Sequence, residues 1–407
     1  MNLDSLLDNL QPQLDWQREI YRRLHRNPEL SMQETGTAEI IEAELSGLGL
    51  TVQRFGGTGR VVVIENGDGP TVLARADIDA LPVTEQTGLD YTSTVDGVMH
   101  ACGHDMHTAA LIGAIRVLAE NRDAWHGTYI GLFQPAEETG VGADAMIDDG
   151  LVAAIPRPEV ALAQHILPLP AGRIATAAGP ILSAAESIKV TVFGRGGHGS
   201  MPHLAIDPVV LAASIVMRLQ SIVAREVPPD QFAVVTVGAL NAGTKSNIIP
   251  DRAELRLNTR SYDPQVRTQL LTAIERIVRA ECQAAGSPQE PTFEYYDEFP
   301  LTSNDADVNA TVTAAFRGYF GDDAVLDSPP VTASEDFSAI PAAFGIPYDY
   351  WFIGSVDPQH YQAAVDAGTV AADIPANHSP FFAPVIDPTL EIGTKAQVVA
   401  ALAYLSD

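Results

Sequence analysis

Thr71-Val72-Leu73-Ala74-Arg75-Ala76-Asp77 is a short, mostly apolar run, and a run of this length predicts a β-strand buried on both faces. Residues 61–65, 128–133 and 160–165 follow the same pattern. The apolar residues of segment 106–120 recur at the three- and four-residue spacing of a helix. Apolar strands that alternate with helices predict an α/β fold, with a central sheet covered by helices on both faces.

A different pattern begins near residue 187. Residues 188–192 alternate apolar and polar side chains, as a half-buried strand does. The elements predicted after it are helix 207–225, strands 232–240 and 252–260, helix 265–284 and strand 292–298. The order strand–helix–strand–strand–helix–strand is the split βαβ pattern. We therefore predict that residues 184–297 form a domain inserted into a larger domain of residues 1–183 and 298–407.

The length and charge of the chain restrict the classes of function. A chain of 407 residues is long enough for two domains, because single cores rarely grow beyond about 250–300 residues. With 52 acidic and 24 basic residues the net charge is −28, which argues against a nucleic-acid partner, since phosphates need a basic surface. No run of about 18 apolar residues occurs, so no membrane span is expected.

Two features bear on the cellular compartment. Residues 1–5 carry neither a basic segment nor an apolar run, so we expect no secretory signal. Cys102 and Cys282 are the only cysteines, which is too few for a disulfide framework. We expect a cytoplasmic protein without a membrane partner.

The strongest chemical signal is the motif His100-Ala101-Cys102-Gly103-His104-Asp105-Met106-His107. It places one cysteine, three histidines and one aspartate within eight residues, directly before a predicted helix. Thiolate and imidazole groups bind zinc and similar ions. Turns between strands and helices lie at the carboxyl edge of open α/β sheets, where ligands bind. A loop with structural histidines is the alternative, but the density of the motif favours a metal site.

Carboxylates follow two of the predicted strands. Asp77 and Asp79 come at the end of strand 71–77, and either could accept a hydrogen bond from a histidine ligand. Glu137 and Glu138 come soon after strand 128–133. Such a pair allows one carboxylate to bind a metal while the other takes a proton from a metal-activated water. An isolated acidic pair is more often a solvated loop, so this interpretation depends on the neighbouring motifs.

Two further histidines could complete a metal site. His165 ends strand 160–165, and His378 follows Asn377 far along the chain. Either histidine alone is more often structural than a ligand. Together with the earlier groups they supply enough nitrogen, sulfur and oxygen atoms for two metal ions.

The inserted segment carries its own polar candidates. Residues 194–203 are a glycine-rich turn that exposes His198, and they lack the Lys-Ser/Thr ending of a phosphate-binding loop. Asn247 follows farther along the chain. The planar guanidinium of Arg260 suits a carboxylate, although local sequence alone favours a surface salt bridge.

These segments together resemble the dinuclear-metal aminoacylase family, which includes hippurate hydrolases, N-acyl-amino-acid amidohydrolases and indoleacetyl-amino-acid hydrolases. Carboxypeptidase G-type enzymes are more distant relatives. The resemblance runs in the same order from His25-Arg26-Asn27-Pro28-Glu29-Leu30 to Asn377-His378-Ser379-Pro380. It implies a zinc-peptidase-like catalytic domain with a mixed central sheet flanked by helices, and an inserted ferredoxin-like lid that mediates a homodimer. One departure is Ala333, where many relatives have glycine, and it bears on the substrate pocket.

The resemblance also implies a role for each matching residue. Each subunit would bind two divalent ions, zinc in the first place and otherwise manganese, cobalt or nickel. Cys102 would bridge the two ions as a thiolate. His104 and Glu138 would bind one ion, and His165 and His378 the other. Glu137 would be the general base and Asp79 would orient a ligand. His198 would stabilise the oxyanion, in its own subunit or across a dimer, and Asn247 and Arg260 would hold the substrate's carbonyl and carboxylate.

The predicted function is metal-dependent hydrolysis of the amide bond of small N-acyl amino acids, which gives a carboxylic acid and a free amino acid. The acyl group, the amino acid and the metal stay open. A dipeptidase or aminopeptidase on the same scaffold is the nearest alternative, and it needs an acidic group for a free α-amine that the sequence does not assign. Glu137 beside Glu138 argues against a non-catalytic binding protein, and the single cysteine of the motif argues against structural zinc.

Overall fold

The computed structural model describes residues 6–7 and 10–406, and the chain divides into two compact units. The larger unit comprises Met1–Ile181, Ser303–Pro329 and Asp336–Asp407, and the smaller comprises Leu182–Thr302 and Pro330–Glu335. The sequence analysis assigned residues 330–335 to the larger domain, whereas the structure groups them with the smaller unit. Residues 1–5, on which the expectation of no secretory signal rests, lie outside the described residues.

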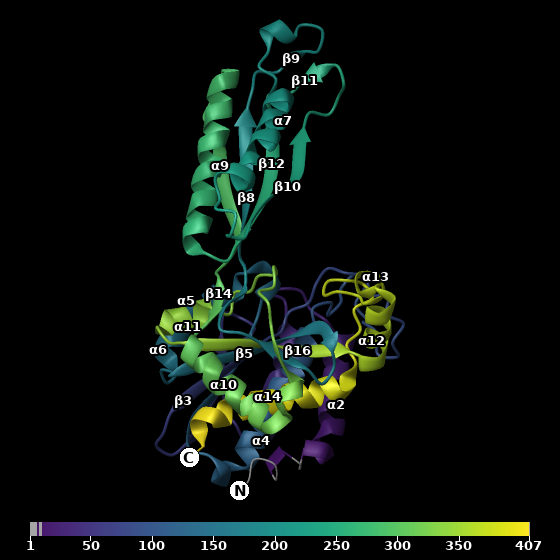
Figure 1. Cartoon of the computed structure of the whole chain (residues 1–407), viewed down its shortest axis with the longest axis vertical. Coiled ribbons are helices and arrows are strands. Elements are labelled where there is room, and N and C mark those ends of the chain that lie inside the picture. The colour runs from purple at the N-terminus through teal and green to yellow at the C-terminus, as the bar shows by residue number, and fades with distance from the viewer. Residues whose placement is uncertain (1–5, 8–9, 407) are drawn as a thin grey trace. The chain divides into compact units, whose positions relative to one another are not determined.

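The larger unit is built on a mixed sheet with the strand order β1-β2-β4-β3-β5-β16-β6-β15 (Figure 1). Its strands are β1 Val52–Phe55, β2 Gly59–Asn66, β3 Thr71–Asp77, β4 Gly127–Gln134, β5 Val160–Pro170, β6 Ile174–Thr176, β15 Val325–Asp327 and β16 Tyr348–Val356. β4, β3, β5 and β16 run parallel to one another in the centre, and antiparallel pairs flank them. β3, β4, β16 and the first half of β5 are almost wholly buried, which explains their mostly apolar sequence.

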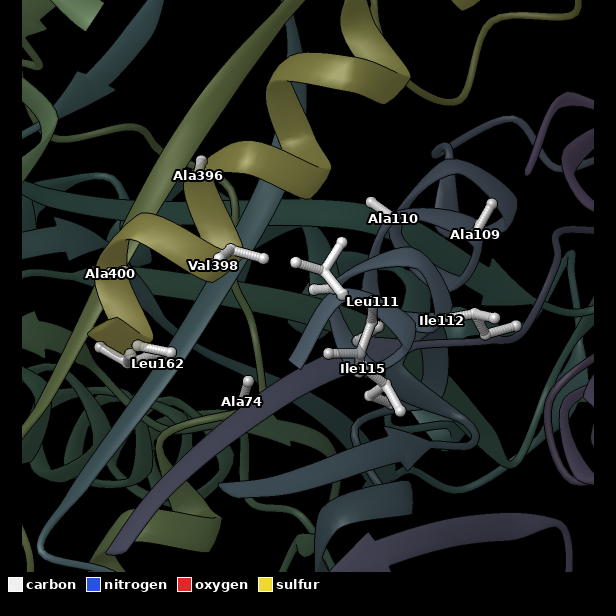
Figure 2. Close-up of a cluster of buried hydrophobic side chains, with 14 of the residues drawn as sticks. Ala74, Ala109, Ala110, Leu111, Ile112, Ile115, Leu162, Ala396, Val398 and Ala400 are labelled. Carbon is white, nitrogen blue, oxygen red and sulfur yellow. The ribbon is translucent and has the colours of Figure 1, made fainter. Parts of the chain in front are cut away.

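The helices of the larger unit pack on this sheet through apolar side chains. They are α2 Gln11–Arg26, α3 Thr35–Gly47, α4 His104–Glu120, α5 Gly142–Asp148, α6 Leu151–Ala154, α10 Ala306–Phe320, α11 Ala339–Phe344, α12 Pro358–Ala367, α13 Val370–Asp373 and α14 Ile386–Leu405, with short 3-10 turns η2 Arg122–Ala124, η3 Glu137–Thr139 and η5 Asp322–Ala324. α4 and α14 contact each other as well as β3 and β5. Figure 2 shows part of the core at this contact, where Leu111, Ile115 and Val398 gather with Ala74 and Leu162. This core fixes α4, whose first residue belongs to the predicted metal motif.

The smaller unit is a four-stranded antiparallel sheet with two long helices. The chain enters it through β7 Gly179–Leu182 and leaves it through β14 Thr302–Asn304. Its elements are β8 Ala184–Phe193, β9 Gly197–His198, η4 Pro202–Leu204, α7 Pro208–Leu219, α8 Ser221–Arg225, β10 Ala233–Ala242, β11 Ile248–Ile249, β12 Arg252–Ser261, α9 Pro264–Ala285 and β13 Thr292–Phe299. The sheet order is β10-β12-β8-β13, and α7 and α9 pack on β8 and β12 around a separate apolar core (Figure 1).

Among the described residues, one helical segment, Pro208–Arg225, is long and apolar enough to cross a membrane, judged by length and composition alone. The sequence analysis expected no such span. In the structure the segment is divided into α7 and α8, and one third of it is buried. Leu211, Ile215 and Leu219 face the core of the smaller unit, whereas Val210 and Met217 are exposed. Packing on the sheet therefore explains only part of its apolar character.

The predicted fold class is confirmed. The central apolar strands form a mixed sheet flanked by helices, and the inserted segment has the order and sheet arrangement of a ferredoxin-like unit. The predicted helix 207–225 ends and restarts near Gln220, which the apolar pattern did not reveal.

Candidate metal centre

Three parallel strands of the larger unit bring the predicted residues to one edge of the sheet. β3 ends at Asp77, β4 ends at Gln134, and β5 carries His165 beyond its buried apolar half. Because these strands are parallel, their carboxyl ends lie at the same edge. The loops that follow supply Asp79 and the pair Glu137 and Glu138.

The structure brings all five predicted metal ligands together. Cys102, Glu138 and His378 each offer an atom within 4.8 Å of the others. His104, Glu137 and Glu138 form a second group of the same kind, so Glu138 belongs to both. The Sγ of Cys102 lies 3.4 Å from Nε2 of His165, and Nε2 of His378 lies 3.4 Å from Oε2 of Glu138. Two overlapping ligand groups are the arrangement that two neighbouring ions need.

Two buried atoms at this centre fit a bound cation. The Nε2 of His104 and the Oε1 of Glu138 have no hydrogen-bond partner among the described residues, and they lie 3.8 Å apart. Buried polar atoms are rarely left without a partner. An ion with ligand bonds of about 2.0–2.2 Å fits between atoms at this separation. The donor set of thiolate, imidazole and carboxylate suits zinc and similar divalent ions.

The pKa values of the buried groups at the site also favour a bound cation. Burial lowers the pKa of His104, but the carboxylates of Asp77 and Asp79 outweigh it and raise the pKa to about 10. Burial raises the pKa of Glu138 to about 7, partly offset by His104. Burial also raises the pKa of the Cys102 thiol well above its usual value, and Glu138 and Glu137 add to the effect. Buried groups of one sign without enough counter-charge are expensive, and a divalent cation would compensate them.

Local backbone geometry places His104 at the centre. Gly103, directly before α4, has a left-handed conformation with φ of 88°. A Cβ atom added there would lie 2.2 Å from the side chain of Ile166, so the position requires glycine for both reasons. The turn at Gly103 starts α4 with His104, whose Nδ1 donates to Oδ1 of Asp79 at 3.1 Å. That bond leaves Nε2 as the ring nitrogen available to a metal.

Asp79 connects the two halves of the centre. Its Oδ1 accepts hydrogen bonds from His104 and from the Glu137 backbone N–H at 3.1 Å. Its Oδ2 accepts from the Glu138 backbone N–H at 3.1 Å and from the Ser31 hydroxyl at 2.7 Å. One buried carboxylate thus fixes a histidine together with the turn that carries both glutamates.

His107 is close to the centre, but both of its ring nitrogens are engaged elsewhere. Nδ1 donates to Oδ1 of Asp77 at 2.6 Å, and Nε2 accepts from the Ile166 backbone N–H at 2.8 Å. Asp77 is also paired with Arg75 at 2.7 Å, fully buried. The sequence analysis counted His107 in the metal motif but gave neither His107 nor Arg75 a specific role. The spacing of His104 and His107 on one helix face was the signal that could have drawn attention to His107.

The remaining predicted residues lie in the smaller unit. His198 and Asn247 are neighbours: His198 pairs with Ile248 across β9 and β11, and Gly199 donates to the Asn247 carbonyl at 2.9 Å. Both side chains are exposed. Arg260 lies near the opposite end of β12, eight residues after Arg252, which is roughly 25 Å along an extended strand. Figure 1 shows β9 and β11 beyond the end of the sheet where β12 begins. The structure therefore brings His198 and Asn247 together but not Arg260.

Comparison with known proteins gives consistent results. The model of peptidase family M20/M25/M40 matches residues 73–376. Thermostable carboxypeptidase 2 of Saccharolobus solfataricus is 35% identical over 409 residues, covering 99% of this chain and 98% of the relative. N-acetyl-L-cysteine deacetylase of Bacillus subtilis is 38% identical over 322 residues, covering 78% and 76%. Among solved structures, the Bacillus subtilis YXEP protein, described as a dinuclear metal binding peptidase from the M20 family, has a TM-score of 0.78 and 27% identity, covering 96% of this chain and 98% of that one.

Proposed function

This chain belongs to peptidase family M20/M25/M40, as its motifs predicted, and on that premise we propose that it hydrolyses the amide bond of N-acyl amino acids. The products would be a carboxylic acid and a free amino acid. N-acetyl-L-cysteine deacetylase, by its name, acts on a substrate of this class, and it is 38% identical to this chain.

The observation that supports the proposal is the position of two adjacent glutamates, Glu137 and Glu138, beside the same nitrogen of His104. The Oε1 of Glu138 and the Oε2 of Glu137 each lie 3.8 Å from the same nitrogen of His104. In this proposal Glu138 is a metal ligand, together with Cys102, His104, His165 and His378. Glu137 is then not needed as a ligand, and its carboxylate lies close enough to the centre to reach a water molecule there. Two divalent ions held there, zinc in the first place, would activate that water and polarise the substrate carbonyl.

Glu137 would act as the general base in this reaction. It takes a proton from the attacking water and then passes it to the leaving nitrogen, so that the amide C–N bond breaks with release of a neutral amine. Asp79 holds the backbone of Glu137 at 3.1 Å and thereby limits the positions its carboxylate can take. His198 would donate to the oxygen that develops negative charge in the transition state.

The surroundings of Arg260 support the proposal that the substrate is an anion. It has no carboxylate within ion-pair distance among residues 6–7 and 10–406, although acidic residues outnumber basic ones by more than two to one. Its Nη1 donates to the Thr332 carbonyl at 2.5 Å and its Nε to Asn258 at 3.2 Å, which orient the guanidinium. Burial lowers the pKa of Arg260. A half-buried guanidinium without a counter-ion is stabilised by a substrate carboxylate.

The test is amine release from N-acetyl, N-benzoyl and long-chain N-acyl amino acids, with unblocked dipeptides beside them, before and after chelation. We expect chelator-sensitive release from the acylated compounds. Glu137→Gln should lose roughly 10²–10⁴-fold in kcat while it keeps its zinc, because the base is removed but no ligand is. Loss of zinc in that variant would contradict the assignment of Glu137 as base. No release from any acylated compound would contradict the proposed function.

A peptidase activity is the second candidate. Its support is the 35% identity to a thermostable carboxypeptidase over nearly the whole chain. A carboxypeptidase also cuts an amide bond whose amine side is an amino acid with a free carboxylate, so the same arginine would serve it. Amine release from the dipeptides alone would favour peptidase activity over the hydrolysis of N-acyl amino acids.

We also propose that the protein is a homodimer in which His198 serves the partner's site. His198 and Arg260 are assigned to one substrate, yet they lie at opposite ends of β12, farther apart than a small N-acyl amino acid can span. A second copy that contributes His198 and Asn247 resolves this conflict. Both cysteines are free, and the cytoplasm stays our expected location.

The smaller unit has a surface suited to such a dimer. β10 is an edge strand without a charged residue, whereas the other edge strand, β13, carries several acidic side chains. Uncharged edge strands tend to pair with another strand. On α7, Val210 and Met217 are 63% and 74% exposed and form an apolar stripe with Ala213. A strand edge and an apolar helix face on one unit suit a self-complementary contact between two copies.

Mixing two inactive variants tests the shared site. Glu137→Gln and His198→Ala chains, unfolded and refolded together, should recover about a quarter of wild-type activity if His198 acts across the dimer, because half of the dimers are mixed and each has one complete site. If His198 acts within its own chain, no mixed dimer has a complete site and activity stays at the level of the separate variants. A monomeric mass in solution would contradict the dimer itself.

A further inference from the structure

The turn that carries Glu137 and Glu138 begins with an unusual backbone conformation. Ala136 has φ of 50° and ψ of 39°, the left-handed region that residues with a Cβ seldom adopt, and it is fully buried. This conformation bends the chain after β4, so that the N–H groups of Glu137 and Glu138 both point to Asp79. The position of both glutamates therefore depends on how Ala136 is held.

Glu34, more than one hundred residues earlier, provides the acceptor for this turn. Its Oε1 accepts the Ala136 backbone N–H at 2.8 Å and the Met32 backbone N–H at 2.9 Å. Its Oε2 accepts the Thr58 hydroxyl at 2.7 Å. The Glu34 side chain is completely buried, and burial raises its pKa. Without it, the buried N–H of Ala136 would lose the acceptor it uses here.

The carboxyl of Glu34 does not cap the helix at whose N-terminus it lies. Glu34 is the N-cap residue of α3, a position where the short side chains of Ser, Thr, Asp and Asn commonly accept a free N–H group of the first turn. It makes no such bond. Instead Glu29 accepts the N–H groups of Gly36 and Thr37 at 2.9 and 2.8 Å. A second glutamate thus caps the helix and leaves Glu34 for the turn at Ala136.

We propose that Glu34 is a positioning residue of the metal centre, which holds Ala136 in its left-handed conformation and thereby places Glu137 and Glu138. The inference rests on the proposed function for the role of Glu137, but its effect on Glu138 can be measured as metal binding alone. Loss of a residue that supports a ligand from outside the ligand set usually lowers metal affinity or activity by roughly 10–100-fold.

The experiment compares three variants of the full-length protein. Glu34→Ala removes the acceptor, Glu34→Gln keeps one neutral oxygen for the Ala136 N–H, and Glu29→Ala is the matched control that removes a carboxylate bound to two backbone N–H groups of α3. Zinc retention against a competing chelator, kcat, KM and melting temperature are measured for each. Glu34→Ala should lose roughly 10–100-fold in zinc affinity and in kcat with KM little changed, and Glu34→Gln should lose less. Glu29→Ala should melt at a lower temperature yet retain zinc as the wild type does.

A second substitution separates positioning from general damage. Glycine adopts the left-handed conformation without the steric cost that alanine has, so Ala136→Gly added to Glu34→Ala should recover part of the lost zinc affinity and kcat. No recovery, or equal losses in Glu34→Ala and Glu29→Ala, would overturn the proposal. If Glu34→Ala does not fold, Glu34→Gln decides, and wild-type zinc affinity and kcat in that variant would overturn it. A wild type that binds zinc but hydrolyses none of the compounds would refute the proposed function and leave the zinc comparison intact.

Discussion

Asp79→Asn tests the connection between the histidine and glutamate halves of the metal centre. In the wild type each carboxylate oxygen accepts two hydrogen bonds, from His104 and the Glu137 N–H on Oδ1, and from Ser31 and the Glu138 N–H on Oδ2. An amide of the same shape has one oxygen and one NH₂ group, and the NH₂ group cannot accept. The hydroxyl of Ser31 can rotate to accept from it, but a backbone N–H cannot.

The least costly orientation therefore places the NH₂ group at the Oδ2 position and leaves the Glu138 N–H without its acceptor. A buried donor left unsatisfied costs about 1–3 kcal/mol. The loss falls on the turn that carries a predicted ligand, so zinc affinity should drop by roughly 10–100-fold. Chelator competition on the zinc-loaded protein measures the affinity, and thermal unfolding of the metal-depleted protein measures the change in stability.

Ser31→Ala is the control for this prediction. It removes one of the four donors but leaves the carboxylate and its backbone bonds, so zinc affinity should stay within a few-fold of the wild type. Asp79→Asn with unchanged zinc affinity would refute the argument that this carboxylate fixes both halves of the centre. Equal losses in the two variants would assign the effect to the hydroxyl instead.

Three further predictions follow from the geometry of the larger unit. Cys102→Ala should lower zinc content below that of the wild type because it removes the thiolate at the centre, and full occupancy by elemental analysis would contradict a bridging role. Gly103→Ala should lower the melting temperature more than Gly57→Ala does. Both glycines have φ of 80° or more, but only at Gly103 would an added Cβ atom meet a side chain within 4 Å. Equal shifts in melting temperature would contradict this packing argument. Burial lowers the pKa of His25, but Asp105 and a second carboxylate outweigh burial and raise the pKa to about 9. The ion pair of His25 with Asp105 therefore stabilises the fold fully below pH 6.5, and this contribution to the free energy of unfolding is lost as the pH rises through 9. Urea unfolding midpoints at pH 6 and pH 10 should differ more for the wild type than for His25→Gln, and equal differences would contradict the prediction.

The sequence predicted the fold class and the motif from His100 to His107 because both depend on local patterns, whereas the full set of five ligands, with His165 and His378, followed from the family resemblance. Apolar runs such as 71–77 are long enough to mark buried parallel strands, and polar residues directly after them mark the carboxyl edge of the sheet. The motif from His100 to His107 combines ligand types that seldom occur together by chance. These signals need no knowledge of distant contacts.

The supporting residues were not predictable in the same way. Glu34 lies at the N-terminus of α3, yet its carboxyl accepts from the N–H of Ala136, which is more than one hundred residues away in sequence. The ring of His107 is paired with Asp77 and the Ile166 backbone, and no spacing along the chain reveals such a contact between strands and a helix. Among the described residues no carboxylate pairs with Arg260, and this is likewise a property of the folded unit, because Asp251, Glu254 and Asp263 lie near it in sequence.

The insertion of the smaller unit has a consequence for synthesis of the chain. β8 to β13 follow one another without interruption, so the sheet of the smaller unit can form once they have left the ribosome, before residues 330–335 join the unit. β5 has to wait for its neighbour β16, which is made about 180 residues later, and during that interval an apolar strand edge has no partner on one side. His378 arrives later still. A nascent chain of this protein would therefore leave one edge of β5 unpaired during this part of translation, and it could not assemble all five predicted ligands until residue 378 had left the ribosome.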